Sequence, residues 1–436
     1  MAAGRVPPHS AAVPAHPRDA RGRKPEKRIA LRNLFQRHRV VESTAQKRSP
    51  ATVAIHPSGE AAPGPLVTPI FASSTFRVKD SKQGAEFAHT IAPREYYTRW
   101  GNPTTADLED TVAKLEGGAA ALATGSGMGA IASAILTFVK SGGHVVAGMS
   151  PYTATVEILE HLLPRFRVRT TWVDQRVPGT FAESVEDETS LVYVETPANP
   201  TMMITDFREA VKAAKSVGAV VLADNTFATP INQRPIDFGV DVVLHSATKY
   251  LGGHSDVVAG VAVARTRTLF DRIWYTYKLL GPTLGPFEAF LVRRGIKTLP
   301  VRMHQQNKNG MALAKHLEDH RGVSKVHYPG LKSFEQHSLA RRQMGGFGAM
   351  LSFELKGGYK AGLRFVESVR LATLAVSLGG VETLVQQPAS MSHGTLTAKE
   401  RKAQGVNESL VRVSVGLEDI DDLTEDFDQA VRKASH

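Results

Sequence analysis

The chain has 436 residues, of which 42% are hydrophobic and 22% are charged, values typical of a soluble globular protein with two or three domains. It contains no cysteine, which excludes disulfides, thiolate metal sites and cysteine nucleophiles. The net charge is +11, but residues 1–50 hold twelve Lys and Arg against three Asp and Glu, so residues 51–436 carry only about two positive charges. This nearly neutral body gives little support for nucleic-acid binding, and its apolar runs are too short to cross a membrane.

The first 50 residues form a basic arm that is rich in Pro, Arg and Ala and is predicted to be disordered. Only residues 29–42 within it have helical periodicity. We interpret the arm as a solvated tail or an over-extended reading frame, with an organelle transit peptide or a nucleic-acid or membrane contact as alternatives. Because no secretion signal or membrane span is indicated, we expect a cytoplasmic protein.

Between residues 105 and 265, strand-like runs alternate with helix-like stretches. This alternation predicts an α/β fold with a mostly parallel central sheet and helices on both faces. The predicted helices are 126–140, 152–163 and a helix capped by Asp206; the predicted strands are 144–148, 167–173, 191–197, 219–226, 240–246 and 259–264.

After residue 297, helices such as 302–320 mix with strands such as 348–357 and 410–418, which indicates a smaller α+β domain. The predicted organisation is therefore a basic arm (1–50), an N-terminal segment (51–104), a large domain (105–297) and a small C-terminal domain (298–436).

Polar side chains follow three of the predicted strands, at the edge where parallel sheets bind ligands. They are Glu195 and Asn199 at or just after the end of 191–197, Asp224, Asn225 and Thr226 at the end of 219–226, and Ser246, Thr248 and Lys249 at or just after the end of 240–246. A lysine and a carboxylate at one edge suit pyridoxal phosphate, whose aldehyde binds a lysine and whose ring nitrogen needs an acidic partner. The alternative is that Asp224 is a structural hydrogen-bond acceptor.

The glycine-rich turn "ATGSGMGAI" (123–131) opens a predicted helix and precedes the first predicted strand, 144–148. Free N–H groups at a helix start can bind a phosphate, although such a turn is more often a plain helix start. The hydroxyls of Ser246 and Thr248 would add donors.

Five motifs in order resemble the Cys/Met-metabolism family of pyridoxal-phosphate enzymes, over residues 52–434. The motifs are "YYTRWGNPT" (96–104), "ETPANPT" (195–201), "LADNTFATP" (222–230), "SATKYLGGHSDVVAG" (246–260) and "SLGGVETLVQQPASMSH" (377–393). The family includes cystathionine γ-synthase, cystathionine β- and γ-lyases, methionine γ-lyase and O-acylhomoserine sulfhydrylases. The resemblance implies a fold-type I, aminotransferase-like architecture that binds pyridoxal 5'-phosphate.

The resemblance also implies a role for each matching residue. Lys249 would form the Schiff base and act as catalytic base, Asp224 would hold the ring nitrogen, and Tyr152 would stack on the ring and relay protons. The cofactor would be held further by the backbone N–H groups of Gly127 and Met128, by Ser246, Thr248 and Thr226, and by Tyr97 and Arg99 of a neighbouring subunit. The substrate carboxylate would be bound by Arg412, Asn199 and Ser377.

Plainer interpretations stay open for some of these residues. Arg412, Tyr97 and Arg99 could be surface residues, and Tyr152 could pack in the core. Histidine spacing of the metal-binding kind is absent, so we expect the sixteen histidines to be structural and expect no metal. A small-molecule amino-acid substrate and a homo-oligomer, a dimer of dimers with shared sites, are expected, without nucleic acid or membrane.

The resemblance favours γ-elimination from a sulfur-containing or homoserine-derived amino acid, giving an α-keto acid, ammonia and a thiol. The alternatives are γ-replacement on O-acetyl- or O-succinylhomoserine, by a sulfhydrylase or cystathionine γ-synthase, and a non-catalytic binding protein on the same fold. Val376 before Ser377 resembles the methionine γ-lyase branch, and Ser377 in place of tryptophan argues against a cystathionine β-lyase. Ala154, Tyr277 and Lys278 depart from the methionine γ-lyase pattern.

Overall fold

The computed structural model describes residues 48–57, 64–394, 397–403 and 405–435. Almost all of the predicted arm, including the helical stretch 29–42, lies outside these residues. Within the described ranges, no helix combines the length and apolarity that a membrane span requires.

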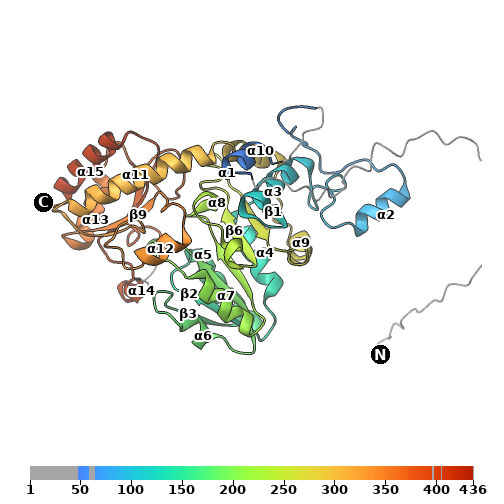
Figure 1. Ribbon diagram of the computed structural model, residues 1–436, viewed down its shortest axis with the longest axis horizontal. Helices are drawn as coiled ribbons and strands as arrows, with labels where there is room; N and C mark the ends of the chain where they lie inside the picture. The colour runs from blue at the N-terminus through green and yellow to red at the C-terminus, as the bar shows by residue number, and fades with distance from the viewer. Residues whose placement is uncertain (1–47, 58–63, 395–396, 404, 436) are drawn as a thin grey trace, which may run out of the picture. The chain divides into compact units, whose positions relative to one another are not determined.

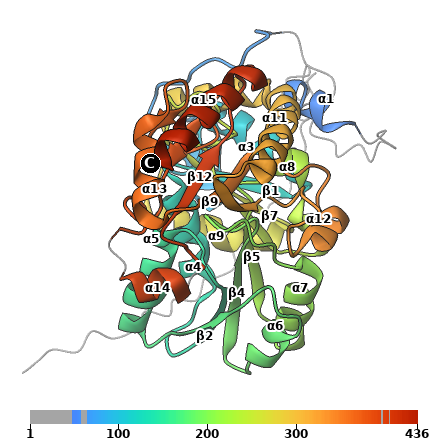
Figure 2. The same ribbon diagram turned by 90° about the vertical axis from the view of Figure 1, so that its left-hand side faces the viewer.

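The centre of the larger part is a seven-stranded sheet (Figures 1 and 2). Its strand order is β1 (Ala120–Thr124), β7 (Gly260–Ala264), β6 (Val242–Ser246), β5 (Val220–Asp224), β4 (Thr189–Glu195), β2 (His144–Gly148) and β3 (Arg169–Val173). Strand β7 runs antiparallel to both of its neighbours, β1 and β6, and the other pairs of neighbouring strands are parallel. The mostly parallel α/β sheet and all six predicted strands are therefore confirmed.

Strand β1 was not predicted. The first predicted strand, 144–148, is therefore the second strand along the chain, and β1 directly precedes the glycine-rich turn. Its sequence, AALAT, lacks both alternating polarity and the β-branched aliphatic residues, Val and Ile, that mark the other strands of this sheet. Pairing with β7 on one side places it in the sheet nonetheless, so tertiary context decides its structure.

Helices cover both faces of this sheet. α3 (Pro103–Glu116) and α7 (Phe207–Ser216) bury apolar side chains in one core, and α4 (Gly127–Phe138) and α9 (Arg267–Leu280) in the other. The Asp206 carboxylate caps α7 as predicted, accepting from Arg208 N at 2.9 Å. The predicted helix 152–163 is instead a short α5 (Thr153–Glu157) followed by one π-helical turn (Ile158–Leu162). The remaining helices in this part are α1 (Pro50–Ile55), α2 (Ser81–His89), α6 (Thr180–Ser184), α8 (Thr229–Asn232) and α10 (Pro286–Ile296).

A second sheet of five strands follows in the C-terminal part, in the order β10 (Thr373–Leu374), β11 (Leu384–Gln386), β12 (Leu410–Ser414), β9 (Met350–Leu355) and β8 (Val323–His327). Its helices are α11 (Leu299–Asp319), α12 (His337–Gln343), α13 (Gly358–Ser368), α14 (Ala398–Ala403) and α15 (Ile420–Ala434). The rings of Phe353, Phe365 and Phe427 pack 5.1–6.3 Å apart and join β9 to α13 and α15. Strand β12 is central, so its side chains are buried.

Candidate active site

A cavity of about 520 Å³ lies at the carboxyl ends of β4, β5 and β6, and residues of β11, β12 and the loop before β11 complete its wall. Of the predicted site residues, it is lined by Gly127, Met128, Tyr152, Asn199, Asp224, Thr226, Ser246, Thr248, Lys249, Ser377 and Arg412. The structure thus brings these side chains together, as expected for strand ends that share one edge.

Lys249 lies three residues beyond the end of β6, and its amine points to the loop between β10 and β11. Nζ donates to Ser377 Oγ at 2.6 Å. Burial and, to a smaller extent, the nearby Arg412 guanidinium together lower the pKa of Lys249 to about 8. A larger fraction of this amine is therefore neutral near physiological pH than for an ordinary lysine, which suits a nucleophile or base.

Asp224 ends β5, beside Glu195 at the end of β4. Its Oδ1 accepts from Thr226 N at 2.9 Å, and Thr226 Oγ1 accepts from Ser246 N at 2.9 Å. Burial raises the pKa of the Asp224 carboxyl, while the hydrogen bonds from Thr226 oppose that shift. A cation bound against this carboxylate would favour its ionised form.

Glu195 was noted as a polar strand-end residue but was not predicted to have a role in the site. Its Oε2 accepts from Tyr152 N at 2.8 Å and its Oε1 from Asn199 N at 3.1 Å. Burial and the charge of Asp224 raise its pKa. One carboxylate thus holds the backbones of two predicted site residues, and its place at the end of a buried strand was the available signal.

The glycine-rich turn does open a helix, because Ser126 caps α4 by accepting from Gly129 N at 3.0 Å. The first N–H groups of α4 have no acceptor within the helix and are available to an anion. A Cβ on Gly127 would lie 2.8 Å from Ser246 Cβ, so only glycine lets the helix start approach Ser246 this closely. The Thr248 hydroxyl, in contrast, is engaged with the backbone of Ala259, with Oγ1 at 3.2 Å from Ala259 O and 3.0 Å from Ala259 N.

Arg412, in the middle of β12, is a buried cation with only neutral partners. The residue is 5% exposed; Nη2 donates to Ser377 O at 2.6 Å and Nη1 donates to Asn199 Oδ1 at 3.2 Å. Gln386, which was not predicted, contributes its amide oxygen at 3.0 Å from Nη1. Among the described residues no carboxylate forms an ion pair with Arg412, and burial lowers its pKa to about 10. A buried guanidinium without a counterion favours the binding of an external carboxylate.

Two predicted residues, Tyr97 and Arg99, do not line this cavity. Tyr97 is 39% exposed, and the Arg99 guanidinium lies 5.3 Å from the centre of its ring. Arg99 Nη1 also donates to Lys278 O at 2.6 Å. A contribution from a neighbouring subunit, the predicted role of this pair, is not tested within one chain and stays a prediction.

These features fit pyridoxal phosphate. A half-buried amine and a buried carboxylate follow or end adjacent strands. The start of α4, where glycine allows close approach to Ser246, offers N–H groups for a phosphate. Solved structures similar to this one include cystathionine γ-synthase from Xanthomonas oryzae pv. oryzae, with a TM-score of 0.83 and 40% identity over 89% of this chain and 99% of that chain. The fold and the site define a fold-type I pyridoxal-phosphate-dependent enzyme.

Comparison of the sequence with protein families gives the family itself. Residues 51–432 match the model of the Cys/Met metabolism PLP-dependent enzymes, and the chain belongs to this family. Its relatives include L-methionine gamma-lyase of Treponema denticola, 46% identical over 85% of this chain and 93% of the relative. They also include cystathionine beta-lyase of Lactococcus lactis subsp. cremoris, 41% identical over 85% of this chain and 95% of the relative.

Proposed function

We propose that this enzyme catalyses γ-elimination from a sulfur-containing or homoserine-derived L-amino acid, releasing an α-keto acid, ammonia and a thiol. The observation that carries the proposal is the buried, unpaired Arg412 guanidinium facing the same cavity as Lys249 and Asp224. Relatives at 43–46% identity are named L-methionine gamma-lyase, which supports elimination as the first choice.

The bound cofactor supplies an aldehyde and an electron-accepting ring. In the proposed mechanism, Arg412 binds the substrate carboxylate and orients the Cα–H bond, with Asn199 and Ser377 holding the guanidinium in place. Lys249 removes the α-proton, which its lowered pKa favours. Asp224 would hold the ring nitrogen. Departure of the γ-substituent also needs loss of a proton from Cβ, and Tyr152 would donate the proton that the leaving group takes up. Water then enters to release the keto acid and ammonia. Glu195 positions Tyr152 and Asn199 through their backbone N–H groups.

γ-Replacement on O-acetyl- or O-succinylhomoserine is the second candidate, because the solved structure named above is a cystathionine γ-synthase. Among the residues that depart from the methionine γ-lyase pattern, Tyr277 is 5% exposed, and the Lys278 ammonium lies 4.5 Å from the ring centre of Trp100. Neither lines the cavity, nor does Ala154, whereas Val376 does. Of the residues that bear on the branch of the family, Val376, which resembles the methionine γ-lyase branch, is therefore the one that we expect to contact substrate.

A substrate panel separates the two candidates. The enzyme is incubated with methionine, cystathionine, O-acetylhomoserine and O-succinylhomoserine, each with and without added sulfide or cysteine, and keto acid, ammonia and thioether products are quantified. Keto acid and ammonia formed without added thiol are expected. Products that form only when a thiol is added would refute elimination as the main reaction.

Arg412→Lys tests the observation on which the proposal depends. Lysine keeps the charge but loses the two-pronged geometry, so we expect kcat/KM to fall about 100-fold or more, mainly through KM. Absorbance of the bound cofactor should be unchanged. Equal KM values in the two proteins would contradict the assigned role.

We further propose that the enzyme works as a homo-oligomer, in which Tyr97 and Arg99 complete the site of a neighbouring subunit. Both side chains are exposed and neither lines the cavity of its own chain, which supports this arrangement.

A further inference from the structure

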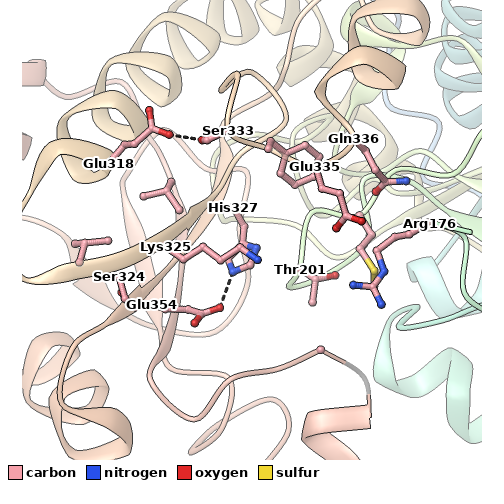
Figure 3. Close-up of a pocket in the computed structure, with 15 residues that line it drawn as sticks. Arg176, Thr201, Glu318, Ser324, Lys325, His327, Ser333, Glu335, Gln336 and Glu354 are labelled. Carbon is pink, nitrogen blue, oxygen red and sulfur yellow. Dashed lines mark hydrogen bonds and ion pairs between the residues drawn. The ribbon is translucent and has the colours of Figure 1, made fainter.

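A second cavity, of about 340 Å³, is lined in part by residues of the loop that follows β4 (Figure 3). It shares no lining residue with the catalytic cavity. Its walls come from β8, from Glu354 of β9, from the turn 333–336 and from Thr201 and Met203 of the loop, with Arg176 at one side. We call it the β8 cavity.

The walls of the β8 cavity are fixed by hydrogen bonds. Glu354 Oε1 lies 2.8 Å from His327 Nε2 and Glu354 Oε2 accepts from Asn407 Nδ2 at 2.8 Å, and the bond with His327 holds the pKa of Glu354 below its usual value. Gln336 bonds both backbone polar groups of Ile204, at 2.8 Å and 2.6 Å, and so ties the turn to the loop. These hydrogen bonds fix the cavity between the loop after β4 and the strands β8 and β9.

One polar group in this cavity has no partner. Thr201 is 6% exposed, and its hydroxyl forms no hydrogen bond with any residue that the structure describes. In Figure 3 this side chain lies between Arg176 and Glu335 on one side and Lys325 and His327 on the other. The oxygen itself has almost no exposed surface, so a ligand reaches it only when a neighbouring side chain shifts. Because a buried hydroxyl without a partner is costly, a ligand that completes its hydrogen bond would be favoured.

The charges of the β8 cavity are of both signs. Arg176 is already paired with Asp174, at 2.9 Å and 2.7 Å. Lys325 and Glu335 are exposed and form no ion pair within the described ranges of the chain. Met203, Val326 and Phe334 add an apolar wall. Glu318, whose carboxylate accepts from Ser333 Oγ, also lines the cavity, and the charge of Lys325 acts on Glu354 and that of Glu335 on Arg176. Exposed charges of both signs beside an apolar surface are complementary to a zwitterion with an apolar side chain.

We propose that the β8 cavity binds a free α-amino acid with an apolar side chain. Its carboxylate lies beside Lys325 and the Thr201 hydroxyl, its ammonium group lies beside Glu335, and its side chain packs on Phe334. This site is distinct from the catalytic one, and its occupation does not depend on the reaction proposed above.

The location connects the β8 cavity to the catalytic cavity. Thr201 and Asn199 belong to one loop, and Asn199 contacts Arg412 on the catalytic side. Ser352 Oγ donates to Pro200 O at 2.7 Å, and Ser352 pairs with Arg412 in the register of β9 and β12. A ligand against Thr201 is thus two residues along the chain from a partner of the Arg412 guanidinium.

Isothermal titration calorimetry with L-leucine tests the proposal. The cofactor-loaded Arg412→Met variant is used, because it lacks the guanidinium that would draw leucine into the catalytic cavity. We expect saturable binding, weakened about tenfold by each of Thr201→Val, Lys325→Met and Glu335→Gln, since each removes one polar contact with the ligand. Lys332→Met is the matched control, because Lys332 is equally exposed nearby but does not line the cavity, and it should leave the affinity unchanged.

Two leucine derivatives test the chemistry of the ligand. N-acetyl-L-leucine lacks the ammonium group and L-leucinamide lacks the carboxylate, so both should bind about tenfold more weakly than L-leucine. Absence of saturable heat in the Arg412→Met protein, or one affinity shared by all the variants, would overturn the proposal. N-acetyl-L-leucine binding as tightly as L-leucine would show a simple anion site and would overturn it too. Because the readout is heat without turnover, failure here is distinguishable from failure of the proposed elimination.

Discussion

Ser377 contacts both cations of the catalytic cavity: its hydroxyl accepts from Lys249 Nζ at 2.6 Å, and its carbonyl accepts from Arg412 Nη2 at 2.6 Å. The residue has φ +79°, a left-handed conformation that directs these two groups. Lys249 follows a strand of the seven-stranded sheet, whereas Arg412 lies in the five-stranded sheet. A single serine therefore joins the amine from one sheet to the guanidinium of the other.

The lowered pKa of Lys249 predicts its reactivity. Only the neutral amine is nucleophilic, so in cofactor-free protein the rate of trinitrophenylation of Lys249 should rise with pH through about 8. An ordinary lysine would show this rise near about 10.4. Arg412→Met removes a positive charge that lowers this pKa, so the midpoint should move upward. Mass spectrometry of the labelled peptide gives both curves, and a midpoint near 10 in the unchanged chain would contradict the burial argument.

Glu195→Gln should reduce activity while leaving the fold intact. The amide keeps one acceptor but places an NH₂ group against either Tyr152 N or Asn199 N, so one backbone segment of the site loses its anchor. We expect kcat/KM to fall about 10- to 100-fold. Glu209→Gln is the matched control, since the Glu209 carboxylate also accepts a backbone N–H, from Gly179 at 2.8 Å, but outside the cavity. A similar loss of activity in both variants would mean that the effect is not specific to the site.

Gly127→Ala should weaken cofactor binding. The added Cβ would lie 2.8 Å from Ser246 Cβ, and relieving this contact moves the start of α4 at a cost of about 1–3 kcal/mol. The dissociation constant for pyridoxal phosphate, measured by absorbance titration, should rise about tenfold or more. Gly84→Ala in α2 is the control, because its Cβ would come no closer than 3.8 Å to another side chain. Unchanged affinity in Gly127→Ala would argue against the start of α4 as the phosphate cradle.

Subunit mixing tests the proposed sharing of sites. Arg99→Ala and Lys249→Ala should each be nearly inactive alone. If Arg99 completes a neighbour's site, unfolding and refolding the two together should restore about a quarter of the activity, since half of random dimers are mixed and each holds one intact site. Recovery should be absent if Arg99 acts within its own chain.

Local patterns in the sequence predicted the sheet and the polar strand ends, whereas Tyr152, Ser377 and Arg412 were predicted only through the resemblance to the family. Branched aliphatic runs marked six strands, and each polar strand end fell at one edge. Strand β1 was not predicted, since AALAT takes its structure from pairing with β7. Gln386 was not predicted as a site residue either, because its contact with Arg412 depends on the pairing of β11 with β12, which no local signal reveals. The engagement of the Thr248 hydroxyl by Ala259 likewise depends on how two loops meet.

The residues predicted to hold the cofactor and those predicted to contact the substrate come from different sheets. Asp224 and Lys249, the groups predicted to hold the cofactor, follow strands of the seven-stranded sheet, whereas Arg412, Gln386 and the neighbouring Val376 come from the five-stranded sheet and the loop beside it. Changes in the second sheet can therefore alter which amino acid is consumed while the cofactor chemistry is inherited intact. Such a scaffold lets substrate preference diverge in evolution without reinventing catalysis.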